Sequence, residues 1–295
     1  MGLLLQTLVF GVLLGSLYAL ASSGLSLTFG VLRIVNLVHG SLLITGGYLT
    51  YTLWSVLGGL DPIVCILLTT PMMGLIGWAL YTALIRPTIA GGDGGTMMAT
   101  FAVMIAAEGI FALVWGNTPL TVAPPYARTS IALGDLVIPH AQLYAALVAL
   151  VVLGALGAVL RFTKLGRSIR AAASNPAGAR LVGIRVSRVN ALTYAIGAAT
   201  AGAGGALISV IYPLTPDSWG AWLARGLAIV ALGGMGSFLG TFVAALLFGV
   251  AETLVTAYVS LTWTVAVPYV VIIAVLIFKP RGLFGSRGRT DISTP

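Results

Sequence analysis

The sequence predicts an all-α integral membrane protein, a polytopic transmembrane helical bundle of about eight or nine spans. Hydrophobic residues make up 59% of its 295 residues and charged residues only 7%, and the mean hydropathy is +1.06. A soluble domain carries roughly 25% charged residues, so this chain has too little charge to cover a water-facing surface. Its apolar runs, such as 144–160 and 265–278, are continuous. Continuous runs indicate helices, because barrel strands alternate apolar and polar residues.

Polar breaks divide the chain into nine apolar stretches. A helix needs about 20 mostly apolar residues to cross the hydrocarbon core. Two places depart from this pattern: 222–236 is short and rich in glycine, and 33–40 interrupts an apolar run. We expect broken or re-entrant helices there, which leaves the side of the N-terminus open. In chain order, the candidate spans are 5–28, 40–57, 63–85, 96–115, 141–160, 190–211, 222–236, 239–258 and 264–278.

The basic residues predict the orientation of the chain. Seven of the fifteen fall in one break without an acid among them, which places this break in the cytoplasm by the positive-inside rule. Four spans later, the segment 279–295 carries four more basic residues and one acid, so the C-terminus is predicted to be cytoplasmic as well. We therefore expect one transmembrane domain, 1–295, with a cytoplasmic loop, 161–188, and a cytoplasmic tail, 279–295. The seven basic residues are Arg161, Lys164, Arg167, Arg170, Arg180, Arg185 and Arg188.

Several functions are excluded by what the sequence lacks. The net charge of +8 does not indicate nucleic-acid binding, because the basic residues flank spans instead of forming an aromatic-interleaved soluble face. No phosphate-binding G-x-x-x-x-G-K-[ST] motif occurs, so any ATP hydrolysis takes place on another polypeptide. Cys65 is the only cysteine, which leaves no thiolate set for a metal. The chain is therefore predicted not to be an enzyme.

Two acids fall well inside apolar spans, Glu108 and Glu252. Acids are costly in a bilayer and usually face the bundle interior or water, so each is a candidate for the substrate pathway or for a hydrogen bond between helices. Arg225 and Arg33, at span edges, are possible partners, and the sequence does not say which acid meets which arginine. Trp222, like its neighbour Trp219, is expected to anchor the chain at the membrane interface.

The break at 33–40 supplies the other pathway candidates, Asn36, His39 and Gly40. Unwound backbone at membrane depth is tolerated only where it is buried in protein or lines a watery cavity. Asn36 and His39 are therefore expected either to satisfy the freed backbone groups or to line the pathway. Glycines spaced as small-xxx-small pairs, such as Gly11 with Gly15, predict close helix packing or a moving interface.

The cytoplasmic loop contains a helix start signal, Ser174 or Asn175 before Pro176. A short helix from Pro176 to Leu181, ended by Gly183, is predicted there. Two roles stay open for it. It is shaped to insert into the groove of a partner protein, and its arginines would equally favour anionic lipid headgroups.

Sequence blocks typical of one family follow one another along nearly the whole chain. The most specific is Asn36-Leu-Val-His-Gly, which comes after a helix end at Leu27–Gly30, and Leu165–Ile184 resembles a cytoplasmic coupling loop. The chain is similar to the membrane subunits of bacterial ABC importers for branched-chain amino acids, and its length resembles the smaller, Liv-type permease. It departs from the family pattern at Leu37-Val38 and Glu108, which bear on the substrate. Further matching blocks are Arg86-Pro87, 231–240, 248–254 and 279–285.

The resemblance implies a permease subunit in the inner (cytoplasmic) membrane that translocates branched-chain or related amino acids. It implies as partners a homologous second permease, two cytoplasmic ATPases that use ATP and Mg, and an extracytoplasmic substrate-binding protein, with no cofactor in this chain. Permeases for urea, amides or other small solutes, and an ion-coupled secondary transporter, remain alternatives. The implied ATPase-coupling residues are Gly166, Arg167, Arg170, Ala173, Asn175, Pro176, Ala179, Arg180, Gly183 and Ile184.

Overall fold

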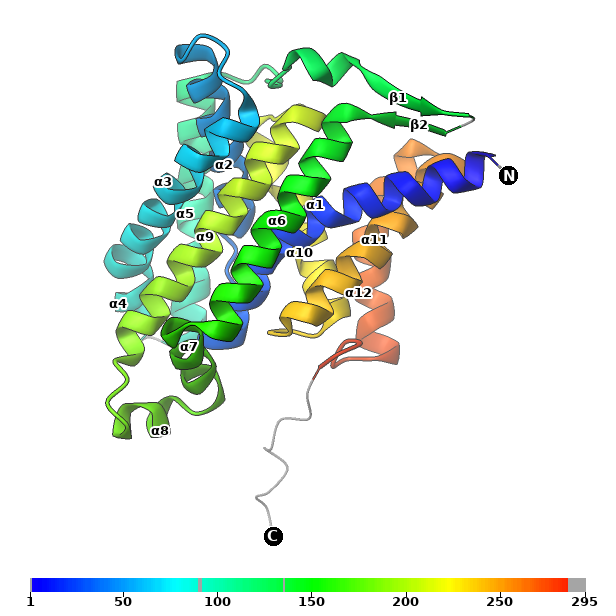
Figure 1. The fold of residues 1–295 in the computed structure, drawn as a ribbon. Helices are drawn as coiled ribbons and strands as arrows, with labels where there is room; N and C mark the ends of the chain where they lie inside the picture. Colours follow the sequence, from blue (N-terminus) through cyan, green and yellow to red (C-terminus); the bar gives the residue numbers. More distant parts are fainter. Residues whose placement is uncertain (1, 90–91, 135, 286–295) are drawn as a thin grey trace.

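The computed structural model describes residues 2–89, 92–134 and 136–285, which form a helical bundle with one short β-hairpin (Figure 1). The predicted all-α fold class is confirmed. The helices are α1 (Gly2–Leu32), α2 (His39–Val56), α3 (Pro62–Leu80), α4 (Arg86–Thr88), α5 (Gly92–Trp115), α6 (His140–Phe162), α7 (Lys164–Ser174), α8 (Pro176–Leu181), α9 (Val186–Ile211), α10 (Trp219–Gly233), α11 (Phe238–Tyr258) and α12 (Val267–Phe278). A π-helical turn covers Tyr81–Ile85, and 3-10 turns cover Pro125–Arg128, Pro216–Ser218 and Leu261–Ala266.

Each of the nine predicted spans coincides with a helix, but not every one of these helices is both long and apolar enough to cross a membrane. Seven helical segments of the described chain have the required length and apolarity. The other two are α2, which begins at the predicted break, and α10, whose 15 residues extend only about 22 Å. The structure therefore supports a bundle with seven candidate membrane-spanning helices, and the finer count of eight or nine stays a prediction.

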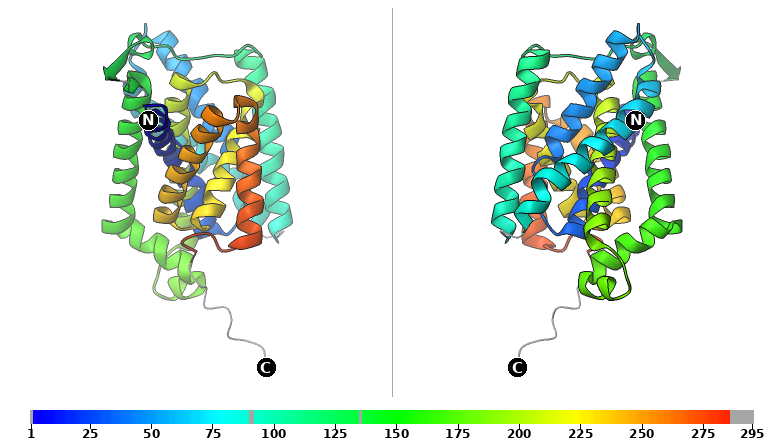
Figure 2. Two further views of the ribbon diagram at one scale, coloured as in Figure 1. Left: turned by 90° about the vertical axis from the view of Figure 1, so that its right-hand side faces the viewer. Right: turned by 90° about the vertical axis from the view of Figure 1, so that its left-hand side faces the viewer.

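Helix α9 forms the centre of the bundle, with α1, α2 and α3 packed around it (Figures 1 and 2). Of its apolar window, 78% is buried, against 44% for α1, so α9 has little surface left for lipid. Small residues make this possible. Gly46 of α2 meets Gly202 of α9, and a side chain at Gly205 would overlap the carbonyl oxygen of Leu43. Two helix backbones thus come together along this line.

Helices α1 and α11 cross at a second such contact. A Cβ atom added at Gly11 would lie 2.6 Å from the Cα of Val250, and one at Gly15 would lie 2.7 Å from the Cα of Leu246. On the facing helix, Gly249 meets Gly15 in turn. The close helix packing predicted from the small-residue spacing is confirmed at this crossing.

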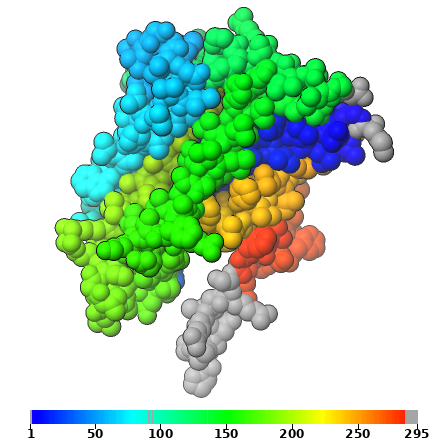
Figure 3. All heavy atoms as spheres, in the orientation of Figure 1, coloured from blue at the N-terminus to red at the C-terminus, as the bar shows by residue number. Residues whose placement is uncertain are grey.

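The two ends of the bundle differ in structure. At one end α7 and α8 project beyond the other helices (Figures 1 and 3), and the segment 279–285 lies at the same end, where the Leu283 N–H donates to the Leu232 carbonyl at 2.7 Å. The opposite end carries an antiparallel hairpin of β1 (Ser130–Leu133) and β2 (Leu136–Pro139). This arrangement agrees with an even number of crossings between the basic loop and the tail. Residues 286–295 of the predicted tail lie outside the described residues.

Near the hairpin end, Asp61 holds the start of α3. Its Oδ1 accepts from the Ile63 N–H at 2.8 Å and from the Tyr126 hydroxyl at 3.2 Å. Burial, and then the Asp61 carboxylate, raise the pKa of Tyr126 well above its usual value, so this hydroxyl stays protonated and able to donate. The contact ties the long segment before α6 to the bundle.

Candidate functional site

The predicted break lies between α1 and α2. Arg33 has φ of +57°, the only left-handed backbone among the non-glycine residues described. Asn36 is buried, and its Oδ1 accepts a hydrogen bond from the Tyr194 hydroxyl of α9 at 3.1 Å. The main-chain carbonyl of Asn36 accepts from the His39 N–H at 3.3 Å. Asn36 therefore fastens the break to the central helix, and its place in the substrate pathway stays a prediction.

His39 and Gly40 bring the starts of two helices together in the bundle interior. The Nε2–H of buried His39 donates to the Ala21 carbonyl of α1 at 2.7 Å, and within the described chain its Nδ1 has no hydrogen-bond partner. A side chain at Gly40 would overlap the Trp219 carbonyl and lie 3.0 Å from the Leu223 Cβ. Gly40 is thus a close contact between α2 and α10.

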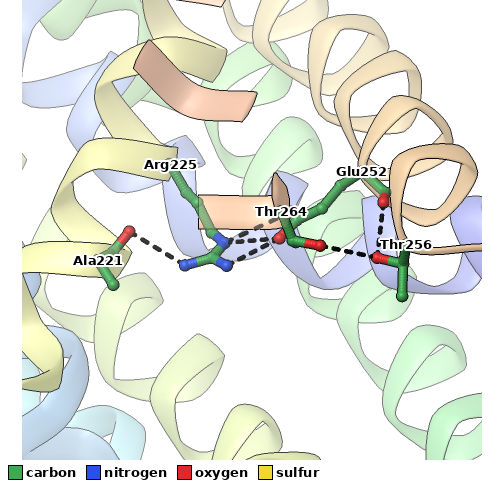
Figure 4. Close-up of polar contacts among 5 residues, drawn as sticks. All are labelled: Ala221, Arg225, Glu252, Thr256 and Thr264. Atoms are coloured by element: carbon green, nitrogen blue, oxygen red, sulfur yellow. Dashed lines mark hydrogen bonds and ion pairs between the residues drawn. The ribbon is translucent and has the colours of Figure 1, made fainter. Parts of the chain in front are cut away.

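Glu252 forms an ion pair with Arg225, which answers the pairing question that the sequence left open (Figure 4). The Nη2 of Arg225 lies 2.8 Å from Oε1 of Glu252, and Nε lies 3.1 Å from the same oxygen. The Arg225 side chain is 17% exposed and the Glu252 side chain is 4% exposed. Nη1 donates to the Ala221 carbonyl at 3.3 Å. By contrast, Arg33 approaches the Ala173 carbonyl, at 3.5 Å.

Neighbouring groups hold this pair in place. The Thr256 hydroxyl donates to the main-chain carbonyl of Glu252 at 2.8 Å and lies 3.0 Å from the Thr264 hydroxyl (Figure 4). The guanidinium carbon of Arg225 lies 5.2 Å from the ring centre of Trp222, a cation–π distance. Three elements, α10, α11 and the turn before α12, therefore meet at the pair.

The pair faces a cavity of about 570 Å³ at the hairpin end of the bundle. Gln6, on its wall, donates through Nε2 to the Val137 carbonyl of β2, which fixes the end at which the cavity lies. Tyr18, Trp222 and Arg225 also line a second cavity of about 10 Å³ that contains His39. The rings of Tyr18 and Trp222 are 6.0 Å apart, and they lie between the large cavity and His39.

Sequence reasoning missed Tyr18 and assigned Trp222 to the membrane interface. The ring of Trp222 packs on Tyr18 and Arg225 at the hairpin-end cavity, and its role as an interface anchor stays a prediction. The available signal was spacing: Trp222 precedes Arg225 by three residues, which puts both on one helix face.

Glu108 lies apart from this cavity. Its Oε2 accepts a hydrogen bond from the indole N–H of Trp219 at 2.7 Å, which joins α5 to the start of α10. It lines a different cavity, of about 370 Å³, together with Asn117 and Asp217. The five predicted pathway residues are thus divided among three places, and only Glu252 lies on the large hairpin-end cavity.

The predicted coupling segment forms two helices, α7 and α8, with a cap before each. The Thr163 hydroxyl accepts from the Gly166 N–H at 3.1 Å, and Asn175 Oδ1 accepts from the Gly178 N–H at 2.9 Å. Of the two predicted caps for α8, Asn175 is therefore the one used. Gly183, with φ of +83°, ends α8 as predicted.

The ten predicted coupling residues differ in exposure. Gly166 and Ala179 are buried against the bundle, and Ala173 and Ile184 are half-buried. The sequence did not single out Leu181 and Val182, which are 89% and 75% exposed although apolar. The exposed members are Arg167, Arg170, Asn175, Pro176, Arg180 and Gly183.

Behind α7, a cavity of about 690 Å³ lies between the ends of α1 and α6 and the start of α11. Its lining is mostly apolar and includes Gly30, Gly157 and Phe238, with Arg161 and Arg170 among the polar members. Any movement of α7 would change the shape of this space.

Membrane-length helices, a charged cavity at one end and a projecting basic helix pair at the other define this chain as an integral membrane transport protein. The chain belongs to the family of permease components of branched-chain amino acid transport systems, whose model matches residues 7–276. The family resemblance seen in the sequence is thereby confirmed.

Named relatives match over almost their full length. The high-affinity branched-chain amino acid transport system permease protein LivH of Escherichia coli K12 is 28% identical over 95% of both chains. The corresponding protein BraD of Pseudomonas aeruginosa is 27% identical over 95% of both chains. The probable permease LivH of Methanocaldococcus jannaschii is 24% identical over 93% of this chain and 90% of its own. No solved structure matches at the stringency that these relatives meet.

Proposed function

We propose that this chain is the membrane-spanning permease subunit of an ATP-binding cassette importer for branched-chain amino acids. It lies in the inner membrane as a multi-pass protein and works beside a homologous second permease. An extracytoplasmic binding protein delivers the substrate at the hairpin end, and two cytoplasmic ATPases act at the α7–α8 end. The observation that carries the proposal is the family match over residues 7–276.

The α7–α8 pair supplies the coupling surface in this proposal. Its exposed apolar residues, Leu181 and Val182, directly follow Arg180 at the end of α8. An apolar tip of this kind fits a groove on a partner protein better than a lipid surface of charged headgroups. When the ATPases use ATP and Mg²⁺, their closure would push on α7, which packs against α1, α6 and α9.

An ion-coupled carrier is less well supported. Such a carrier needs an intramembrane acid that is free to take up and release an ion. Glu252 is held by Arg225, and Glu108 accepts from Trp219. Neither carboxylate is free of a protein partner, so we retain the ATP-driven importer alone.

The test is uptake of labelled leucine into proteoliposomes that hold this chain with its second permease and ATPases. The binding protein is added to the medium outside the vesicles. We expect uptake to require ATP and to persist when ionophores collapse the ion gradients. Uptake that continues without ATP and stops with the ionophores would reject the proposal.

A further inference from the structure

The Arg225–Glu252 pair is open to a ligand on one side. It joins α10 to α11, yet the wall that it forms borders the cavity of about 570 Å³. Pockets for small molecules occupy about 300–1,000 Å³, so the space suits an amino-acid-sized ligand. Each residue lies six positions from the hairpin end of its helix, which places the pair about 9 Å below that end.

Both members of the pair retain hydrogen-bonding capacity. A guanidinium has five N–H donors, and Glu252 and the Ala221 carbonyl accept from three of those of Arg225. The remaining hydrogens on the terminal nitrogens are directed to Tyr18 and the cavity. On the acid, Oε1 takes both short contacts with Arg225, whereas Oε2 lies 3.5 Å from Nε. Beyond these contacts, the guanidinium edge and Oε2 border the cavity side by side, next to Tyr18.

We propose that Arg225 and Glu252 bind the main-chain zwitterion of an amino acid, with its carboxylate on Arg225 and its ammonium group on Glu252. The amino-acid class rests on the proposed function. A zwitterion brings one charge of each sign, so it pairs with both residues and leaves no unpaired charge in the bundle. A ligand with a single charge would leave one member of the pair without compensation, which is costly at a buried site.

The rest of the cavity suits the side chain of such a ligand. Phe10, Leu14 and Trp222 give it apolar walls beside the charged pair. Gln142 also lines it, and the Oε1 of this amide has no partner within the described chain, so it is available to accept from an ammonium group. Charged groups on one wall and apolar groups on another match an aliphatic amino acid. They match urea and simple amides poorly, since those lack both charges.

Protection of a cysteine tests the site directly. In the assembled complex, Cys65→Ala removes the native thiol and Ala257→Cys places a reporter on the cavity wall. We expect leucine to slow maleimide labelling by about tenfold at ten times its Kd, because the free site then falls to about a tenth. The single-charge analogues 4-methylpentanoate and 3-methylbutylamine should leave the rate nearly unchanged. Equal protection by either analogue would overturn the assignment.

A matched control uses Ser130→Cys on the hairpin, outside the cavity, where leucine should have no effect. The double substitution Arg225→Gln with Glu252→Gln removes the charges together, so no unpaired charge destabilises the bundle. When this double substitution is combined with Ala257→Cys, leucine should no longer slow maleimide labelling. Protection that persists in this variant would show that the pair does not bind the ligand.

The exchanged pair Arg225→Glu with Glu252→Arg separates binding from helix joining. It restores an ion pair with the charges inverted, so the apparent Tm of the complex should recover. The zwitterion would then have to bind reversed, with its side chain directed away from Phe10 and Leu14, and protection should stay lost. Full recovery of protection would mean that the pair serves only to join α10 and α11.

Protection is measured without ATP, so it is independent of transport. Leucine protection in a complex that does not import leucine would reject the proposed function and support the site. ATP-driven leucine uptake that survives the double glutamine substitution would reject the site and leave the proposed function standing.

Discussion

A single hydrogen bond ties the break before α2 to the central helix. The Tyr194 hydroxyl donates to Asn36 Oδ1, and both residues are 1% exposed, so no water replaces the contact. A buried polar group that loses its partner costs about 1–3 kcal/mol. This hydrogen bond therefore helps to hold the start of α2 against α9.

Replacing this donor should lower stability. We expect Tyr194→Phe to destabilise the protein by about 1–3 kcal/mol, because Asn36 is left with an unsatisfied oxygen. The measurement is the apparent Tm in detergent. The matched control is Tyr258→Phe, since Tyr258 is 55% exposed and should show no change. Equal Tm values for the two variants would mean that the Asn36 contact contributes nothing.

Backbone contact at Gly205 leads to a second prediction. Gly205→Ala should destabilise the protein by about 1–3 kcal/mol, since the new methyl group would overlap the Leu43 carbonyl and separate α2 from α9. Gly154→Ala on α6 is the control, because nothing lies within 4 Å of its added Cβ. There alanine should raise stability by up to about 1 kcal/mol through its helix propensity. A higher apparent Tm for Gly205→Ala than for Gly154→Ala would contradict the close contact between α2 and α9.

At the scale of elements, α7 and α8 form a unit with two faces. Gly166, Ile169 and Ala172 of α7 are buried against the bundle, whereas Leu181 and Val182 at the tip of α8 face outward. A movement imposed on the tip therefore reaches the bundle through α7. Substitutions at Leu181 and Val182 test docking more directly than substitutions at Gly183. Any side chain at Gly183 would strain its left-handed backbone.

Charges at this tip should release the ATPases. We expect Leu181→Asp with Val182→Asp to reduce their co-purification by about tenfold or more, a loss of ~1.4 kcal/mol or greater, while the apparent Tm stays the same. The control is Leu133→Asp on the hairpin, an exposed leucine at the opposite end. Retention of the ATPases by the double variant would reject α8 as the docking element.

At the scale of the molecule, the seven membrane-length segments form one bundle with unlike ends. The charged cavity lies at the hairpin end, and the projecting pair, with the cavity behind α7, lies at the other. Tyr18 and Trp222 lie between the hairpin-end cavity and His39 in the bundle interior.

The orientation of the bundle can be measured with single cysteines in a Cys65→Ala background. We expect Ser130→Cys on β1 to react with a membrane-impermeant maleimide in intact cells. Ser174→Cys at the end of α7 should react only after the membrane is permeabilised, because its basic surroundings are predicted to be cytoplasmic. Labelling of Ser174→Cys in intact cells would invert the topology and remove the basis for ATPase docking.

The sequence by itself determined the fold class, the positions of the helices and the family. Apolar length and the placement of arginines follow from the cost of burying charge in lipid, and this cost acts locally along the chain. The break at 33–40 and the cap at Asn175 were predictable for a similar reason, since both depend on neighbouring residues.

Only the tertiary structure decided which groups meet. Arg225 and Glu252 are 27 residues apart, Asn36 and Tyr194 are 158 apart, and Glu108 and Trp219 are 111 apart. No local pattern pairs such residues, because their approach depends on how whole helices cross. The same holds for Trp222, whose ring packs on Tyr18 of α1, a contact that no local pattern specifies.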